Sequence, residues 1–121
     1  MLSENPSLKH LEMKNVYLEE NFYVESYAGM TDAWFDDVSF DEHKEFLMNY
    51  PGLEVLYLDG NQLTDIQFVT ALKNLTHLGI QDNYVTDLSA LNQLEKLQYL
   101  DIRMNPISKG VDANENVRIL E

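Results

Sequence analysis

The feature that most constrains this fold is a 22-residue repeat in the second half of the sequence. Its columns read L-x-x-L-x-L-x-x-N-x-L, followed by apolar residues at every third position. The matching residues are Leu53, Leu75 and Leu97; Leu56, Leu78 and Leu100; Leu58, Ile80 and Ile102; Asn61, Asn83 and Asn105; Leu63, Val85 and Ile107; and then Ile66, Val69 and Leu72 with Leu88, Leu91 and Leu94. One such unit cannot bury its own apolar side, so the units must stack on one another.

Each part of the repeat predicts a local structure. The alternation of Leu56 and Leu58 indicates a short strand with one buried face. Apolar residues three apart favour a 3₁₀-like return segment, where such positions share one side. The bend asparagine carries donors and an acceptor for buried backbone groups, and its stacked copies would form a ladder. Thr64-Asp65 and Thr86-Asp87 stand where a polar side chain can cap the return segment.

Together these signals predict a single α/β repeat solenoid over residues 1–121. We expect a short right-handed coil with a parallel sheet on its concave side and mostly 3₁₀ and loop structure on its convex side. Residues 53–108 form the regular repeats, and residues 1–52 form an irregular N-terminal flank. Residues 109–121 are expected to form a loop and a partial terminal strand, which begins at Val117.

The pattern weakens in the N-terminal flank. Leu8, Leu11 and Met13 repeat the spacing L-x-x-L-x-L, and Leu53 follows Leu8 by 45 residues, close to two periods. At the 22-residue spacing Trp34 falls near a core column, whereas Asp36 falls where Leu58 would be. Residues 17–40 are therefore interpreted as an insertion or a distorted strand-and-loop segment.

A helix is predicted near residues 40–50. Ser39 and Glu42 have the spacing of a capping box, and Pro51-Gly52 follows as a stop signal. The residues that share one helical face are Phe40, His43, Leu47 and Tyr50. This helix would replace the 3₁₀ segment of the repeat.

Residues 53–108 resemble bacterial internalin-type leucine-rich repeats, whose 22-residue units carry N-x-L/I-T/S-D-I/L at the bend. The resemblance covers 56 of 121 residues. It implies the leucine-rich-repeat fold. It says little about the ligand, because the matching residues are those that build the repeat.

The composition limits the classes of partner. The chain has 21 Asp and Glu against 8 Lys and Arg, a formal net charge of −13. This charge repels nucleic-acid backbones and anionic membranes and favours a partner with a basic surface, although acidity also simply keeps a protein soluble. No cysteine is present, and no apolar run approaches the roughly 18 residues of a spanning helix. We expect a cytoplasmic protein, unless the chain is a fragment of a longer secreted or surface protein.

The residues between the buried leucines of each strand should face the concave side. The predicted partner-binding residues are Tyr57, Asp59, His77, Gln81, Tyr99, Asp101 and Arg103. If the first unit is real, His10, Glu12 and Lys14 join them. Tyrosine and arginine often carry interface energy, and Tyr57 and Tyr99 are expected to flank a shallow saddle at Gly79. The alternative is an ordinary solvated sheet face.

Metal binding and catalysis have little support in the sequence. The acidic residues Asp32, Asp36, Asp37, Asp41 and Glu42 lack the pattern of an EF-hand loop. They are interpreted as a solvated surface or as a contact patch for a basic protein. His10, His43 and His77 are dispersed, and no catalytic, phosphate-binding or dinucleotide-binding motif is present. We expect no catalytic residue, no metal and no cofactor.

Two functions follow from this reading. The first is a protein–protein interaction module that binds its partner through the concave face. The alternative is a small acidic inhibitor or immunity protein that neutralises a basic toxin or nuclease. The terminal strand, with Val117, Ile119 and Leu120, is expected to pair with a second copy of the chain, because an unpaired edge strand favours self-association.

Overall fold

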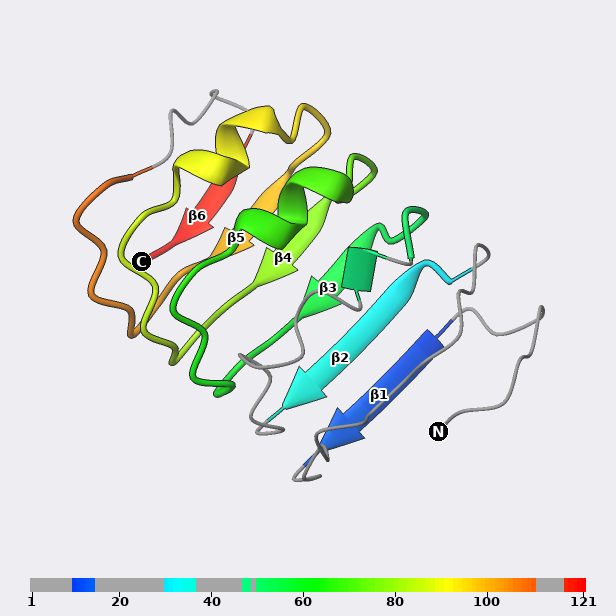
Figure 1. Ribbon diagram of the computed structural model, residues 1–121, viewed down its shortest axis with the longest axis horizontal. Coiled ribbons are helices and arrows are strands. Elements are labelled where there is room, and N and C mark those ends of the chain that lie inside the picture. Colours follow the sequence, from blue (N-terminus) through cyan, green and yellow to red (C-terminus); the bar gives the residue numbers. More distant parts are fainter. Residues whose placement is uncertain (1–9, 15–29, 37–46, 49, 111–116) are drawn as a thin grey trace.

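The computed structural model describes residues 10–14, 30–36, 47–48, 50–110 and 117–121. Their strands form one six-stranded parallel sheet in chain order, with the two chain ends at opposite sides (Figure 1). The strands are β1 (His10–Lys14), β2 (Asp32–Asp36), β3 (Val55–Tyr57), β4 (His77–Gly79), β5 (Tyr99–Asp101) and β6 (Arg118–Leu120). The predicted repeat solenoid with a parallel sheet is confirmed.

The sheet register follows the repeat. Val55 pairs with His77, and His77 pairs with Tyr99, so partners in β3, β4 and β5 lie 22 residues apart. This register sets Leu56, Leu78 and Leu100 side by side, and all three are fully buried. The predicted terminal strand is also present, as β6 beside β5.

The interpretation of residues 17–40 needs a correction. Residues 32–36 form a regular strand of the sheet, with Asp32 paired to Val55, a step of 23 residues instead of 22. This one-residue difference puts Ala33 and Phe35 into the core and moves Trp34 out of it. A shift of one residue exchanges the two faces of a strand, so the expected core position of Trp34 was wrong.

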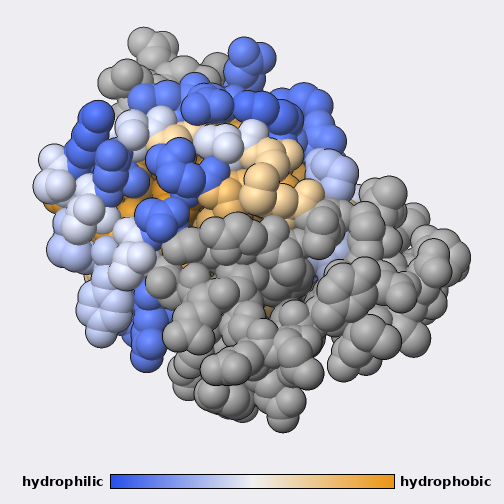
Figure 2. Space-filling model, in the orientation of Figure 1, coloured by the Kyte–Doolittle hydropathy of each residue, from blue (hydrophilic) through white to orange (hydrophobic). Residues whose placement is uncertain are grey.

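The convex side consists of 3₁₀ segments, as predicted. The segments η3 (Gln67–Ala71) and η4 (Ser89–Gln93) cover one face of the sheet (Figure 1). Within one unit, the N–H of Val69 donates to the carbonyl of Ile66 at 3.1 Å, and the N–H of Leu72 donates to Val69 at 2.9 Å. The apolar residue at every third position therefore buries its side chain and closes a 3₁₀ hydrogen bond. Figure 2 shows this side, where hydrophilic residues border an apolar area.

The helix predicted for residues 40–50 lies mostly outside the described residues. Its described end is a 3₁₀ turn at residues 47–48, and the N–H of Tyr50 donates to the carbonyl of Leu47 at 3.0 Å. The N–H of Leu53 then donates to Tyr50 at 3.1 Å. At this end the chain keeps the three-residue spacing of the other return segments, and the helix expected before it stays a prediction.

Asn83 ties two successive coils together at the bend. Its Nδ2 donates to the carbonyl of Leu58 at 2.9 Å and to that of Ile80 at 2.8 Å. Its Oδ1 accepts from the N–H of Asn61 at 2.9 Å and from that of Leu63 at 3.0 Å. One buried amide therefore satisfies backbone groups of its own coil and of the preceding one.

The other two bend asparagines repeat this role. Asn105 donates to the carbonyl of Ile80 at 2.8 Å and accepts from the N–H of Val85 at 3.1 Å. Asn61 donates to the carbonyl of Phe35, which connects β2 to the regular repeats. The asparagine ladder predicted from the sequence is present, and we use that name for Asn61, Asn83 and Asn105.

The bend itself demands a left-handed backbone. The residue before each ladder asparagine has a positive φ: Gly60 at 67°, Asp82 at 58° and Met104 at 60°. Glycine adopts this conformation freely and aspartate tolerates it, whereas a long side chain such as that of Met104 does so at a cost. The hydrogen bonds of the ladder hold the bend in this shape.

The aspartates after the bend also act as predicted. The Oδ1 of Asp65 accepts from the N–H of Gln67 at 3.2 Å, and the Oδ1 of Asp87 accepts from the N–H of Ser89 at 2.8 Å. Each carboxylate therefore accepts a hydrogen bond from the N–H of the first residue of a 3₁₀ segment. The side-chain and backbone hydrogen bonds from Ser89 hold the pKa of Asp87 below its usual range.

Two further features of the described residues are the edge of the sheet and the lengths of the helices. β6 is an edge of the six-stranded sheet, and self-association through it stays a prediction. Among the described residues, no helix is long and apolar enough to cross a lipid bilayer.

We predict that Asn83→Ala destabilises the domain by at least about 2 kcal/mol, because it leaves several buried backbone groups without partners. Chemical denaturation measures this change. Gln98→Ala, which removes an exposed amide, is the control and should alter the free energy of unfolding by less than about 0.5 kcal/mol. Equal unfolding curves for the two variants would contradict the structural role of the ladder.

Candidate protein-binding face

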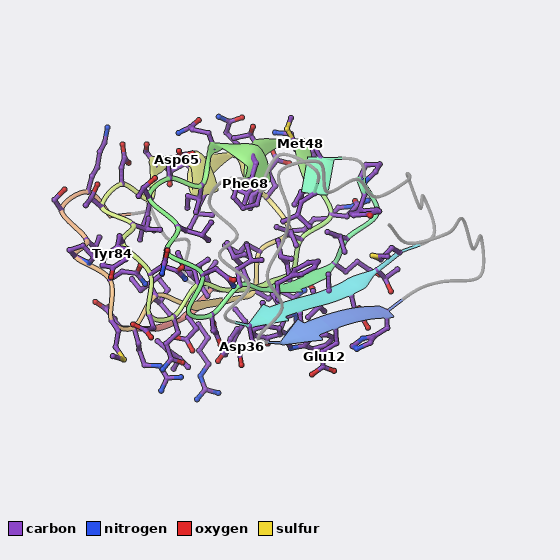
Figure 3. The ribbon with its side chains drawn as sticks, turned by 60° about the horizontal axis from the view of Figure 1, so that its bottom comes forward. Glu12, Asp36, Met48, Asp65, Phe68 and Tyr84 are labelled. Carbon is purple, nitrogen blue, oxygen red and sulfur yellow. The ribbon has the colours of Figure 1, made fainter. Side chains whose placement is uncertain are left out.

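The face of the sheet turned away from the 3₁₀ segments is called the concave face below. Figure 3 shows Glu12 and Asp36 projecting from this face, whereas Asp65, Phe68 and Met48 lie on the opposite side. Because side chains alternate along a strand, every second residue of each strand points to this face. The register therefore decides which side chains become neighbours there.

The register arranges the side chains of the concave face in rows across the sheet. One row contains His10, Asp32, Val55, His77, Tyr99 and Arg118, and the next contains Glu12, Trp34, Tyr57, Gly79, Asp101 and Leu120. Beyond them, Asp36, Asp59, Gln81 and Arg103 follow the same alternation. All seven residues predicted for partner binding lie on this face, and their role in binding stays a prediction.

The aromatic side chains of this face stack on one another. The rings of Trp34 and Tyr57 lie 5.3 Å apart and only 14° from parallel. The ring of His10 lies 4.6 Å from that of Trp34, and His77 stacks on Tyr99 at 5.7 Å. Such contacts restrict the rotamers of large side chains before any partner arrives.

Trp34 is the residue that the sequence reasoning missed. A signal for it was present: Ala33-Trp34-Phe35-Asp36 matches Leu56-Tyr57-Leu58-Asp59 in its alternation once one residue is inserted between the units. This alignment places Trp34 beside Tyr57, as the structure does. Strict adherence to the 22-residue period concealed it.

The saddle expected at Gly79 does not exist. Gly79 is buried, and a Cβ atom at this position would lie 2.3 Å from Cδ1 and 2.8 Å from Cε1 of Tyr57. The phenol ring of Tyr57 therefore lies over the glycine and fills the space that its missing side chain leaves. Glycine is needed here for the close approach of this ring.

Asp101 and Arg103 form an ion pair with two contacts. The guanidinium of Arg103 donates to Asp101 from Nε at 2.9 Å and from Nη2 at 2.7 Å. Nη2 also donates to Oε1 of Gln81 at 3.2 Å. The hydrogen bond from the Arg103 side chain is the main reason why the pKa of Asp101 lies below its usual value. The pair fixes both side chains in one geometry.

Asp59, unlike Asp101, accepts no hydrogen bond from a charged side chain among those described. It is half-buried, and its Oδ1 accepts a hydrogen bond from the backbone N–H of Gln81 at 3.1 Å. Burial raises the pKa of Asp59, and the negative charges of Asp101 and Asp36 raise it further. Burial also raises the pKa of Tyr57, with smaller contributions from Tyr99, Asp59 and Asp101. The negative charge of Asp59 is therefore disfavoured in the folded protein, in contrast to that of Asp101.

His77, one of the three histidines noted in the sequence, lies beside Thr76 and Tyr99. Nδ1 of His77 is 2.8 Å from Oγ1 of Thr76, and its ring packs on Tyr99. Within the described ranges, no group of three His, Asp or Glu side chains could hold a metal ion. In the acidic cluster noted in the sequence, Asp32 and Asp36 lie on β2, and Asp37, Asp41 and Glu42 lie outside the described residues.

Comparison with known proteins identifies the family. Residues 51–92 and 73–115 match the family described as Leucine Rich repeats (2 copies), which together span residues 51–115. The chain belongs to the leucine-rich-repeat family. Among curated proteins, none matches the sequence.

A solved structure shows the same fold. The crystal structure of an internalin C2 from Listeria monocytogenes is similar to this leucine-rich-repeat protein with a TM-score of 0.60 and 24% sequence identity. The similarity covers 94% of this chain and 61% of that chain, so this chain spans about three fifths of the length of its structural relative. The match supports an internalin-like leucine-rich-repeat fold.

The family also bears on the two functions considered above. Leucine-rich-repeat proteins are generally protein-interaction modules, and the fold is typically a scaffold without enzymatic activity. Neither the family match nor the similar structure supports the inhibitor alternative.

We predict that Asp59→Asn raises the melting temperature at pH 7. The amide keeps an acceptor for the N–H of Gln81 and removes a charge that burial, Asp101 and Asp36 disfavour. A carboxyl group whose pKa is raised in the folded state reduces stability above its unfolded pKa of about 3.9, and this reduction disappears as the pH falls below that value.

Thermal melts of both proteins between pH 3 and pH 7 measure the effect. The advantage of Asp59→Asn should shrink as the pH falls. Glu95→Gln removes the same charge from an exposed position and should show a smaller, less pH-dependent change. A melting temperature of Asp59→Asn below that of the wild type at pH 7 would contradict the assignment.

Proposed function

We propose that this leucine-rich-repeat protein binds a protein partner through its concave face, with the stacked aromatic rings as anchors. The observation that carries the proposal is the Trp34–Tyr57 stack at 5.3 Å, continued across the sheet by Tyr99 and by the Asp101–Arg103 pair. Tryptophan, tyrosine and arginine are the residues that most often dominate interface energies.

The preorganisation of this face supports the proposal. Trp34, Tyr57 and Tyr99 are half-buried and held by ring contacts, so a partner would gain their area at little further entropic cost. Arg103 is fixed by Asp101 and Gln81 and presents an oriented guanidinium. These side chains are ready for binding before contact.

The convex side offers a poorer surface among the described residues. Its exposed side chains include long polar and charged ones such as Lys73, Gln93, Glu95 and Lys96. Lysine and glutamate are depleted from interface cores because their ordering costs entropy and their desolvation is unfavourable. The concave face is therefore the better candidate.

The net charge of −13 indicates the chemistry of the partner. We infer a partner with a basic surface, since exposed charges of opposite sign accelerate association and suppress contacts with acidic proteins.

We predict that Tyr99→Ala weakens binding to a partner captured with the wild-type chain by about 30-fold, the effect of losing an anchor worth roughly 2 kcal/mol. Titration calorimetry with the purified partner measures the affinity. Tyr84→Ala is the matched control, because Tyr84 is a tyrosine of the bend region and is 62% exposed. It should bind as the wild type does.

Circular dichroism of both variants checks that they remain folded. If Tyr99→Ala keeps wild-type affinity, or if Tyr84→Ala loses binding to the same degree, the partner does not use the concave face and the proposal is wrong.

A further inference from the structure

A pocket with an aromatic wall lies on the concave face, beside β1, β2 and β3. Its volume is about 240 Å³. The lining residues are Glu12, Trp34, Phe35, Asp36, Tyr57 and Asp59. Trp34 and Tyr57 supply the stacked rings, which form one wall of the pocket.

Three carboxylates surround these rings. Glu12 and Asp36 are exposed and project from the same face of the sheet (Figure 3), and Asp59 is half-buried beside Tyr57. Glu12 Oε2 lies 3.6 Å from Nε2 of His10.

The carboxylate of Asp59 differs from its neighbour Asp101 in how its charge is compensated. Asp101 receives both side-chain hydrogen bonds from Arg103, whereas the hydrogen bond to Asp59 comes from the uncharged backbone N–H of Gln81. Burial and the neighbouring carboxylates raise the pKa of Asp59. A cation at this position would relieve the repulsion that Asp59 now experiences.

We propose that this pocket binds an arginine side chain of a basic protein partner. The inference rests on the proposed function and specifies which part of the partner enters the concave face. A guanidinium is planar and stacks on aromatic faces, and its N–H groups form paired hydrogen bonds with carboxylates. The aromatic wall and the carboxylate rim match these two properties together.

An arginine fits better than the other cations. The ammonium of lysine is a compact, strongly hydrated charge that cannot stack as a plane. A metal ion needs several ligands converging on one point, and the described residues contain no such group.

Trp34 makes the pocket directly observable. It is the only tryptophan of the chain, so its fluorescence reports on this site alone. The probe is a tri-arginine peptide with blocked ends, and tri-lysine at equal ionic strength is the matched peptide. We expect a saturable change in Trp34 emission with tri-arginine and roughly tenfold weaker binding of tri-lysine, because one good stacking contact is worth on the order of 1–2 kcal/mol.

Two double variants separate the pocket from the overall charge. Asp36→Asn with Asp59→Asn should weaken tri-arginine binding by roughly tenfold or more, since it removes two carboxylates that accept charge-assisted hydrogen bonds from the guanidinium. Glu54→Gln with Glu95→Gln removes the same net charge from exposed residues outside the pocket lining and should bind within about twofold of the wild type.

Three results would overturn the inference: no saturable signal, equal affinity for the two peptides, or equal loss of binding in both double variants. The partner titration distinguishes these failures from failure of the proposed function. Loss of the partner by Tyr99→Ala, together with no response to tri-arginine, removes the arginine pocket and keeps the concave face as the interface. If Tyr99→Ala and the Asp36→Asn, Asp59→Asn variant both bind the partner with wild-type affinity, the arginine pocket and the concave interface are both contradicted. This holds whatever the tri-arginine peptide does.

Discussion

The hydrogen bonds of the asparagine ladder are the interaction on which the rest of this structure depends. A coil of this kind must turn sharply after its strand, and the turn leaves backbone N–H and C=O groups pointing into an apolar interior. Asn83 satisfies groups of two successive coils at once, through Leu58 and Ile80 on one side and Asn61 and Leu63 on the other. Buried polar groups without partners would cost more than a small core can supply.

The ladder also connects stability to the proposed binding surface. By tying each bend to the preceding one, it fixes the register of the strands, and the register sets Trp34 beside Tyr57 and Tyr57 beside Gly79. The arrangement of side chains on the concave face therefore depends on the asparagine ladder, which lies outside that face. Asp59 shows the reverse relation, because a residue of the proposed binding surface carries a disfavoured charge that lowers the stability of the fold.

Much of the fold was predictable because certain positions of the repeat accept only one kind of side chain. Only apolar side chains suit Leu56 or Leu78, and only an amide with donors and an acceptor suits Asn83, so these residues stand out at a constant spacing. Seven residues of the concave face followed from alternation alone. The unit containing Trp34 was misplaced, since one extra residue in a loop costs little energy but exchanges the two faces of the next strand.

The geometry within the concave face could not be predicted from the sequence. An alternating pattern shows which side chains point outward but not how a ring tilts. Gly79 was expected to leave a gap, but the ring of Tyr57 fills it. The pocket beside Trp34 depends on the same tilt. Contacts of this kind arise from the packing of neighbouring coils, and a repeat pattern does not encode them.

Native-state amide hydrogen exchange tests most directly whether the ladder holds the fold together. The N–H groups of Leu63 and Val85 lie outside the strands and donate to side-chain oxygens of Asn83 and Asn105. We expect them to exchange with the same opening free energy as the amides of Leu78 and Leu100 in the sheet, because one cooperative opening must break both sets of bonds. Exchange of the Leu63 and Val85 amides at the rate of exposed loops, beside a protected sheet, would contradict this account.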